Sequence, residues 1–153
     1  MVIKEIKYKS DLIKEFEKNR KEFDVGLLEK FDLTPSIIEN IANTYSKKVA
    51  YNKLNNLFDN YWLDNSVDFI ISILEIDSFF DNEDIYIITD GIIKSKEVPL
   101  IKIGFLNEFI SEYYPLRYNE DFFQMTDIIL FTSNFNKFYI IHHEEFIGTL
   151  LLK

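Results

Sequence analysis

The apolar positions in the first half of the chain recur at helical spacing. Residues 10–23, "SDLIKEFEKNRKEF", place leucine, isoleucine and phenylalanine near one stripe, behind a serine that can cap the helix. Residues 34–48, "TPSIIENIANTYSKK", begin with a threonine cap and a proline at the first helical position. The spacing continues through residues 50–63, where we expect Trp62 to be buried. We therefore predict helices over most of the N-terminal half.

The segment that follows does not decide between helix and strand. Residues 65–80, "NSVDFIISILEIDSFF", have apolar spacing that suits a helix capped near Asn65 or Ser66. The isoleucines of the same segment would also suit a strand. Both alternatives stay open at this point.

Short β-rich runs separated by polar turns mark the C-terminal half. They occupy residues 84–90, 127–132, 137–142 and 146–152. The first run ends at Asp90-Gly91, a turn signal, and residues 133–136 resemble a hairpin connection. Residues 100–114 return to helical spacing, and Pro115 is expected to stop that helix.

These elements predict an α+β fold with N-terminal helices packed on a small, mostly antiparallel C-terminal sheet. The 153 residues fit a single globular domain, residues 1–153. Hydrophobic residues make up 47% of the chain and aromatic residues 16%, which is enough for a core built on large rings.

The composition excludes several classes of site and location. The chain has no cysteine, so disulfides, thiolate nucleophiles and cysteine-based metal sites are ruled out. The first ten residues lack the apolar core of a signal peptide. No apolar run approaches the ~20 residues that a membrane-spanning helix needs. We therefore expect a cytoplasmic protein with no membrane partner.

The strongest candidate for chemistry is "YIIHHEEF", Tyr139–Phe146, which holds both histidines of the chain. On a strand His142 and His143 would point to opposite faces, and Glu144 would share the face of His142. A metal needs three or four converging ligands, so we predict no bound metal and no cofactor. The histidines are expected to close a strand, although general acid–base chemistry remains open.

Familiar catalytic motifs are absent from the sequence. It contains no G-x-G-x-x-G, no P-loop, no G-x-S-x-G and no H-E-x-x-H. We therefore predict that the protein is not an enzyme and that it has no catalytic residues.

The negative charge is concentrated in one segment. The net charge is −9, and residues 64–90 contribute 0 basic and 8 acidic groups, or −8. The acids of this segment are Asp64, Asp68, Glu75, Asp77, Asp81, Glu83, Asp84 and Asp90.

This acidic segment admits two interpretations. It can be a solvated face that keeps the protein soluble, or a surface that binds a basic partner. Nucleic acid and anionic membranes would be repelled. Aromatic rings are interleaved with the acids, and carboxylates beside rings can imitate phosphates beside bases. The candidate partner-binding residues are Asp68, Glu75, Asp77, Phe79, Phe80, Asp81, Glu83 and Asp84.

The chain is small, acidic, cysteine-free and aromatic-rich. In these respects it resembles the immunity proteins of bacterial polymorphic toxin and contact-dependent inhibition systems, and its tail from Phe131 to Leu151, "FTSNFNKFYIIHHEEFIGTLL", resembles the C-terminus of an uncharacterised bacterial family of such small proteins. The resemblance implies a protein that binds and neutralises a basic protein toxin, with a nuclease as the expected class of toxin, and it implies no catalytic residues. Two alternatives stay open: a small enzyme or ligand-binding domain using His142, His143 and Glu144, and a regulatory protein-interaction domain. The oligomeric state is not indicated.

Overall fold

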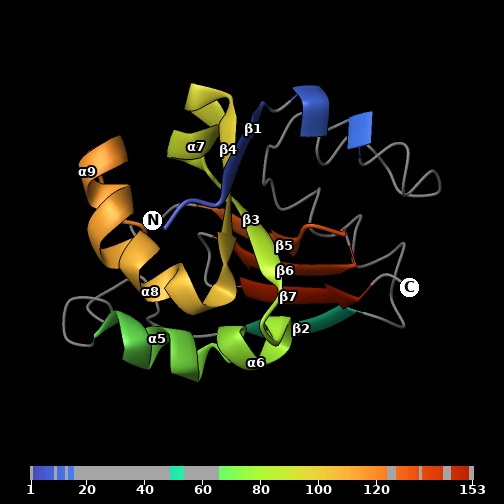
Figure 1. The fold of residues 1–153 in the computed structure, drawn as a ribbon. Coiled ribbons are helices and arrows are strands. Elements are labelled where there is room, and N and C mark those ends of the chain that lie inside the picture. Colours follow the sequence, from blue (N-terminus) through green and yellow to red (C-terminus); the bar gives the residue numbers. More distant parts are fainter. Residues whose placement is uncertain are drawn as a thin grey trace.

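The computed structural model shows a seven-stranded sheet with helices packed against it (Figure 1). For residues 49–53 and for His142 the structure describes the backbone alone. The structure describes residues 2–8, 10–12, 14–15, 49–53, 66–123, 127–134, 136–142 and 146–151.

The strands lie in the order β1-β4-β3-β5-β6-β7-β2, and every neighbouring pair is antiparallel. The sheet is thus fully antiparallel, and the α+β class is confirmed. The strands are β1 (Glu5–Tyr8), β2 (Val49–Lys53), β3 (Asp84–Thr89), β4 (Glu97–Lys102), β5 (Ile128–Thr132), β6 (Lys137–His142) and β7 (Phe146–Leu151).

The three strands predicted at the end of the chain form a meander in which each pairs with the next. The hairpin predicted at residues 133–136 is also confirmed. The Thr132 hydroxyl accepts hydrogen bonds from the backbone N–H groups of Asn136 and Lys137, each at 3.0 Å. The Thr132 side chain therefore satisfies two backbone donors of the β5–β6 connection.

The expected order, helices first and sheet second, holds only in part. Both edge strands come from the first 53 residues of the chain: β1 pairs with β4, and β2 pairs with β7. Residues 50–53 were predicted to be helical, and that prediction is wrong. The open edge of β7 supplies the hydrogen bonds that fix Val49–Lys53 as a strand, and this pairing overrides local spacing. The predicted helix at residues 34–48 and Trp62 lie outside the described residues.

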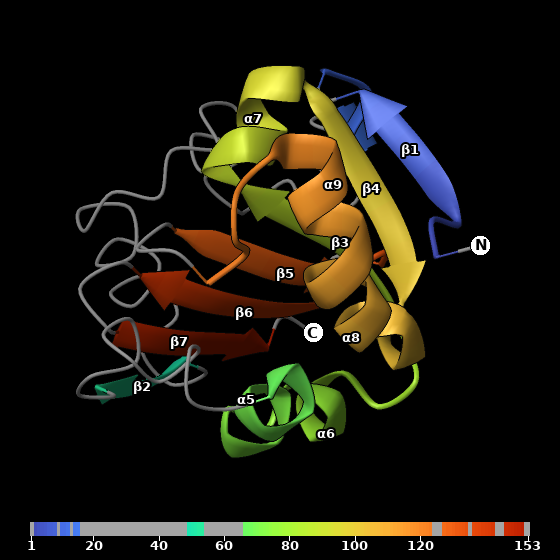
Figure 2. The ribbon, with the colours of Figure 1, turned by 90° about the vertical axis from the view of Figure 1, so that its left-hand side faces the viewer.

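The helices of the middle of the chain cover one face and one end of the sheet. Figure 2 shows α8 and α9 across that face, with α5 and α6 along its lower end. The helical segments are α5 (Val67–Ile73), α6 (Ile76–Phe80), α7 (Asp90–Ser95), the 3-10 turn η2 (Ile103–Phe105), α8 (Leu106–Glu108), the π-helical turn η3 (Phe109–Tyr113) and α9 (Tyr114–Tyr118).

Three predictions for the middle of the chain are wrong. Residues 100–102 were predicted to be helical, but they belong to β4 and pair with residues 84–86 of β3. Pro115 does not stop a helix but lies in the first turn of α9. The Tyr114 N–H bonds to the Phe109 carbonyl five residues back, so a wider π turn directly precedes the proline, whose nitrogen has no hydrogen to donate. Asp90-Gly91 is likewise no simple turn, because these residues begin α7. The Thr89 hydroxyl accepts from the Ile92 N–H at 3.3 Å and starts that helix.

The core lies on both faces of the central strands. Residues 85–89 of β3 are all buried, as expected for a strand covered on both sides. On one face the Tyr139 hydroxyl donates to the Leu74 carbonyl at 2.6 Å and joins β6 to the end of α5. On the other face the Phe131 ring lies 5.3 Å from Tyr86 and 5.3 Å from Phe138, measured between ring centroids.

Candidate protein-binding surface

The acidic segment of residues 64–90 does not form one patch. Asp84 begins β3 and pairs with Lys4, whereas Asp90 follows the other end of the strand. Six residues of strand separate two side chains by ~20 Å, so these two acids cannot act as one site. Asp64 lies outside the described residues.

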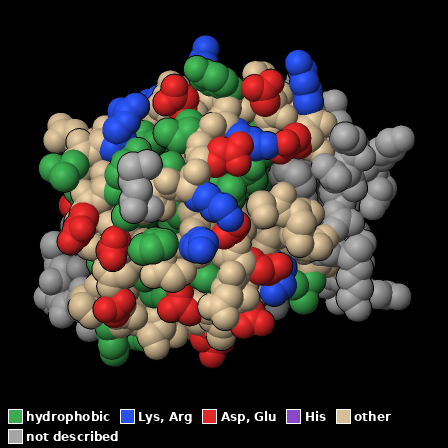
Figure 3. All heavy atoms as spheres, in the orientation of Figure 1, with side chains coloured by type: hydrophobic (Ala, Val, Ile, Leu, Met, Phe, Trp, Pro, Cys, Tyr) green, Lys and Arg blue, Asp and Glu red, His purple; other side chains and the backbone are tan. Residues whose placement is uncertain are grey.

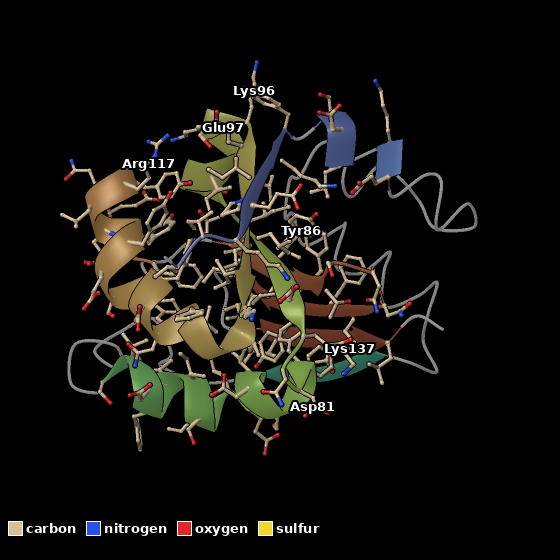
Figure 4. The ribbon with its side chains drawn as sticks, viewed as in Figure 1. Asp81, Tyr86, Lys96, Glu97, Arg117 and Lys137 are labelled. Carbon is tan, nitrogen blue, oxygen red and sulfur yellow. The ribbon has the colours of Figure 1, made fainter. Side chains whose placement is uncertain are left out.

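Glu83 is partly neutralised by a lysine from β6. Lys137 Nζ lies 3.1 Å from Glu83 Oε2, close enough for an ion pair although it is not aligned as a hydrogen bond. The same ammonium group donates to the Phe79 carbonyl at 3.1 Å. Figure 4 shows Lys137 near the end of α6, close to Asp81. This lysine therefore fastens the end of α6 to the sheet.

The four remaining acids are exposed and lie on α5, on α6 or at their ends. Among the residues that the structure describes, no lysine or arginine forms an ion pair with any of them. They are Asp68, Glu75, Asp77 and Asp81.

Sharp backbone turns bound the two short helices on which these acids lie. Ser66 caps α5, its hydroxyl accepting from the Phe69 N–H at 3.2 Å. Glu75 has a φ of 57° and separates α5 from α6. Asp81 and Asn82 have φ values of 46° and 63°, a left-handed conformation that Asp and Asn tolerate. The Glu83 N–H bonds to the Phe80 carbonyl at 3.1 Å and closes this turn toward β3.

The aromatic residues predicted to contact a partner point inward. Phe80 is fully buried, and its proposal as a surface anchor is wrong. Phe79 is half-buried and packs with its ring centroid 5.7 Å from that of Tyr139. Tyr139 and both phenylalanines thus form a small ring cluster beneath α6. Burying these rings is more favourable than leaving them in water, because each ring removes a large apolar area from solvent.

Two apolar side chains on α5 point outward instead. Phe69 is 47% exposed and Ile73 is 37% exposed. They are four residues apart on one helix, so they lie on the same side of α5. An exposed ring with a neighbouring branched side chain, on a pair of helices that also carries exposed acids, has the composition of a protein-binding surface.

We call this region the α5–α6 surface. Figure 3 shows acidic side chains gathered over α5 and α6, along the lower edge of the molecule. It consists of Asp68, Phe69, Ile73, Glu75, Asp77 and Asp81.

The spacing of the apolar residues of α5 does not by itself show which of them are exposed. In a helix, Ile70 and Leu74 form one stripe and Phe69 and Ile73 form the adjacent one. Both stripes are apolar, so either could have faced the core. The structure buries Ile70 and Leu74.

Comparison with family models, with curated proteins and with solved structures finds no match to this chain. The function must therefore be argued from the residues themselves.

The histidine segment can be placed only at its ends. His142 is the last residue of β6 and pairs with Phe146 of β7, as expected for a strand that runs into a turn. Residues 143–145 lie outside the described residues, so the roles of His143 and Glu144 remain predictions. Among the described residues no group of three or more His, Cys, Asp or Glu side chains is arranged to hold a metal ion.

A buried polar cluster lies at the far end of β3. The Tyr114 hydroxyl donates to Glu120 Oε1 at 2.5 Å and lies 2.7 Å from the Thr89 hydroxyl. Burial, and secondarily the bond to Glu120, raises the pKa of Tyr114 far above its ordinary value. Gly91 packs against both groups: a Cβ at this position would meet Glu120 Oε1 at 2.5 Å and the Tyr114 hydroxyl at 3.1 Å. Each polar group of this Tyr114 cluster has a hydrogen-bond partner within the fold, as expected for a cluster that stabilises the structure.

No helix within the described part of the chain has the length and apolar character that crossing a bilayer requires.

Proposed function

We propose that the protein is an immunity protein that binds a basic protein toxin through the α5–α6 surface and blocks it. The observation that carries this proposal is the sorting of the acids. Glu83 and Asp84 are paired within the fold, while four exposed carboxylates lie on α5, on α6 or at their ends, as Phe69 and Ile73 lie on α5, without an ion-pair partner among the described residues. Exposed acids on the same helical pair as an apolar anchor suit a partner with the opposite charge.

The two kinds of residue would act at different stages of binding. The carboxylates attract a basic surface over a distance of about one Debye length and raise the rate of association. Phe69 and Ile73 make short-range contacts, which lower the rate of dissociation once the complex has formed. A nuclease suits this surface because the cleft that binds a polyanion is itself basic. Fixed carboxylates would occupy the positions of phosphates, and the Phe69 ring that of a base.

The test starts from the gene that adjoins the coding sequence of this chain. Its product, expressed alone in a bacterial host, should arrest growth, and co-expression of the chain should restore growth. The triple variant Asp68→Lys, Asp77→Lys, Asp81→Lys should fail to restore it. A matched control reverses three exposed acids elsewhere, Asp11→Lys, Glu112→Lys and Asp121→Lys, and should still protect.

Binding kinetics of the purified pair sharpen the same test. The triple variant should associate at least tenfold more slowly, and added salt should slow wild type more than the variant. Phe69→Ala should instead speed dissociation. If the adjoining product is harmless, or if the triple variant protects as well as the control variant does, this function is wrong.

A further inference from the structure

Among the residues that the structure describes, no strand pairs with the outer edge of β1, and the register on its inner side is defined. β1 is the last strand on its side of the sheet, and Figure 2 shows no described element beyond it. On its inner side it pairs with β4, Glu5 opposite Leu100 and Lys7 opposite Val98. Unpaired strand edges readily accept another strand.

The register of β4 determines which β1 groups face outward. The Ile103 N–H bonds to the Glu83 carbonyl at 3.2 Å, so the odd-numbered residues of β4 direct their backbone groups toward β3. Pro99 has no N–H, and the β3–β4 ladder accordingly ends at the Tyr86–Leu100 pair.

Even-numbered residues of β4 therefore direct their backbone groups toward β1, where Leu100 stands opposite Glu5 and Val98 opposite Lys7, and the Leu100 carbonyl accepts from the Lys4 N–H at 2.8 Å. Backbone groups of successive residues in a strand point to opposite sides, so those of Ile6 and Tyr8 must point away from the sheet.

Exposed apolar side chains accompany these outward-facing groups. Ile6 is 50% exposed and Tyr8 is 61% exposed. Ile6 also lines an apolar groove of about 460 Å³ between the N-terminal segment and the helical layer, next to Leu116, which is 88% exposed. The other residues that line the groove are Val2, Ile3, Glu112 and Tyr113.

The sequence of β1 is complementary to itself in the antiparallel direction. When two copies are aligned on Ile6, each Ile6 stands opposite Ile6 of the other copy. Glu5 of each copy then stands opposite Lys7 of the other, which gives two pairs of opposite charge on one face. The outward-facing backbone groups of the two Ile6 residues would also exchange both hydrogen bonds.

We propose that two copies of this chain associate through β1 and form one continuous antiparallel sheet across a two-fold axis. In this register Tyr8 of one copy lies beyond the end of the other copy's β1, one diagonal step from Ile6 of that copy. The aromatic ring can therefore reach the mouth of the partner's apolar groove, where Ile6 and Leu116 are exposed. The contact is isologous, because the same strand, groove and charges serve both copies.

Cross-linking tests the register directly, because the chain has no cysteine of its own. Residues in a hydrogen-bonded antiparallel pair have Cα atoms ~5.5 Å apart, within the range that a disulfide spans. The Ile6→Cys variant should therefore oxidise to a covalent dimer. The Tyr8→Cys variant is the matched control, since its two thiols would be separated by about four residues of strand, or ~13 Å. We expect cross-linking to be at least tenfold faster for Ile6→Cys, and equal rates would overturn the proposal.

Sedimentation equilibrium supplies the second test. Wild type should dimerise with rising concentration, and Ile6→Lys should raise the dimer dissociation constant at least tenfold by placing like charges opposite each other. Ile6→Pro should do the same, because it removes two intermolecular hydrogen bonds but no bond to β4. Ile73→Lys, the same change on the α5–α6 surface, should leave dimerisation intact. Circular dichroism checks that each variant unfolds cooperatively. A wild type that is monomeric throughout, or a dimer that survives both Ile6 variants, would contradict the proposed interface.

Discussion

The two ends of β3 hold their carboxylates in opposite ways. Beyond the Thr89 end, Glu120 accepts a hydrogen bond from a buried tyrosine, and Glu97 lies 4.0 Å from Arg117 (Figure 4). At the Asp84 end Asp84 and Glu83 are paired with lysines, but four further carboxylates on α5, on α6 and at their ends face solvent. The comparison separates acidic residues that have donors within the fold from those that face solvent without a donor among the described residues, and the second group is the one that a partner could reach. Local charge density alone does not separate the two.

Replacing one aromatic residue near each end of β3 by alanine should give the largest difference in the free energy of unfolding. Tyr114→Ala removes a fully buried ring and should lower the free energy of unfolding by ~3–5 kcal/mol. Phe69→Ala removes a half-exposed ring and should change it by no more than ~0.5 kcal/mol. Urea denaturation measures both. A loss above ~2 kcal/mol for Phe69→Ala would mean that this ring belongs to the core and is not an anchor.

Overpacking the Tyr114 cluster should have the next largest effect on the free energy of unfolding. Gly91→Ala inserts a Cβ against Glu120 Oε1 and the Tyr114 hydroxyl, and should cost ~1–3 kcal/mol of unfolding free energy. In a chain that already carries Glu120→Ala, the same change should cost clearly less, because the obstructing carboxylate is gone. Additive costs in this double-mutant cycle would show that Gly91 and Glu120 do not interact.

The smallest expected effect is a loss of stability at alkaline pH. Burial raises the pKa of Tyr114 in the folded state, so the unfolded chain loses this proton first. The stabilisation from the neutral hydroxyl is complete below a pH of ~10 and declines as the pH rises above it, by up to ~1.4 kcal/mol per pH unit. Tyr139 adds a contribution of the same sign, because burial and the nearby Glu75 raise its pKa.

Tyr114→Phe should make this alkaline decline shallower, which denaturation at several pH values would measure. Phe69 has no ionisable group, so Phe69→Ala should leave the pH dependence unchanged. A decline that is as steep in Tyr114→Phe as in wild type would exclude Tyr114 as its source.

The sequence predicted β3 and the three strands at the end of the chain, but it missed β4, whose residues 100–102 fit a helical spacing. The β5–β6–β7 meander follows from β-rich runs and short polar turns, and each strand needs only the next one. The edge strands depend on partners more than ninety positions away, Glu5 on Leu100 and Val49 on Leu150. Local spacing carries no information about such partners, so β1 was missed and β2 was predicted to be helical.

The candidate site was predictable in charge but not in its apolar part. The acids of residues 64–90 were evident from counting, and most of those on α5 and α6 are indeed exposed. Adjacency to acids pointed to Phe79 and Phe80 and missed the more exposed Phe69, because it says nothing about which stripe of a helix faces the sheet. Phe79 and Phe80 both pack around the buried Tyr139 of the sheet, and Phe80 is fully buried.

The hydrogen bond from Tyr139 to the Leu74 carbonyl has a consequence for the affinity of any complex. It anchors the junction of α5 and α6 to the middle of the sheet at 2.6 Å, while Lys137 holds the end of α6. The backbone beneath the exposed carboxylates is therefore ordered before a partner arrives. Association then loses the freedom of a few surface side chains but little of the main chain, and more of the contact free energy remains as binding.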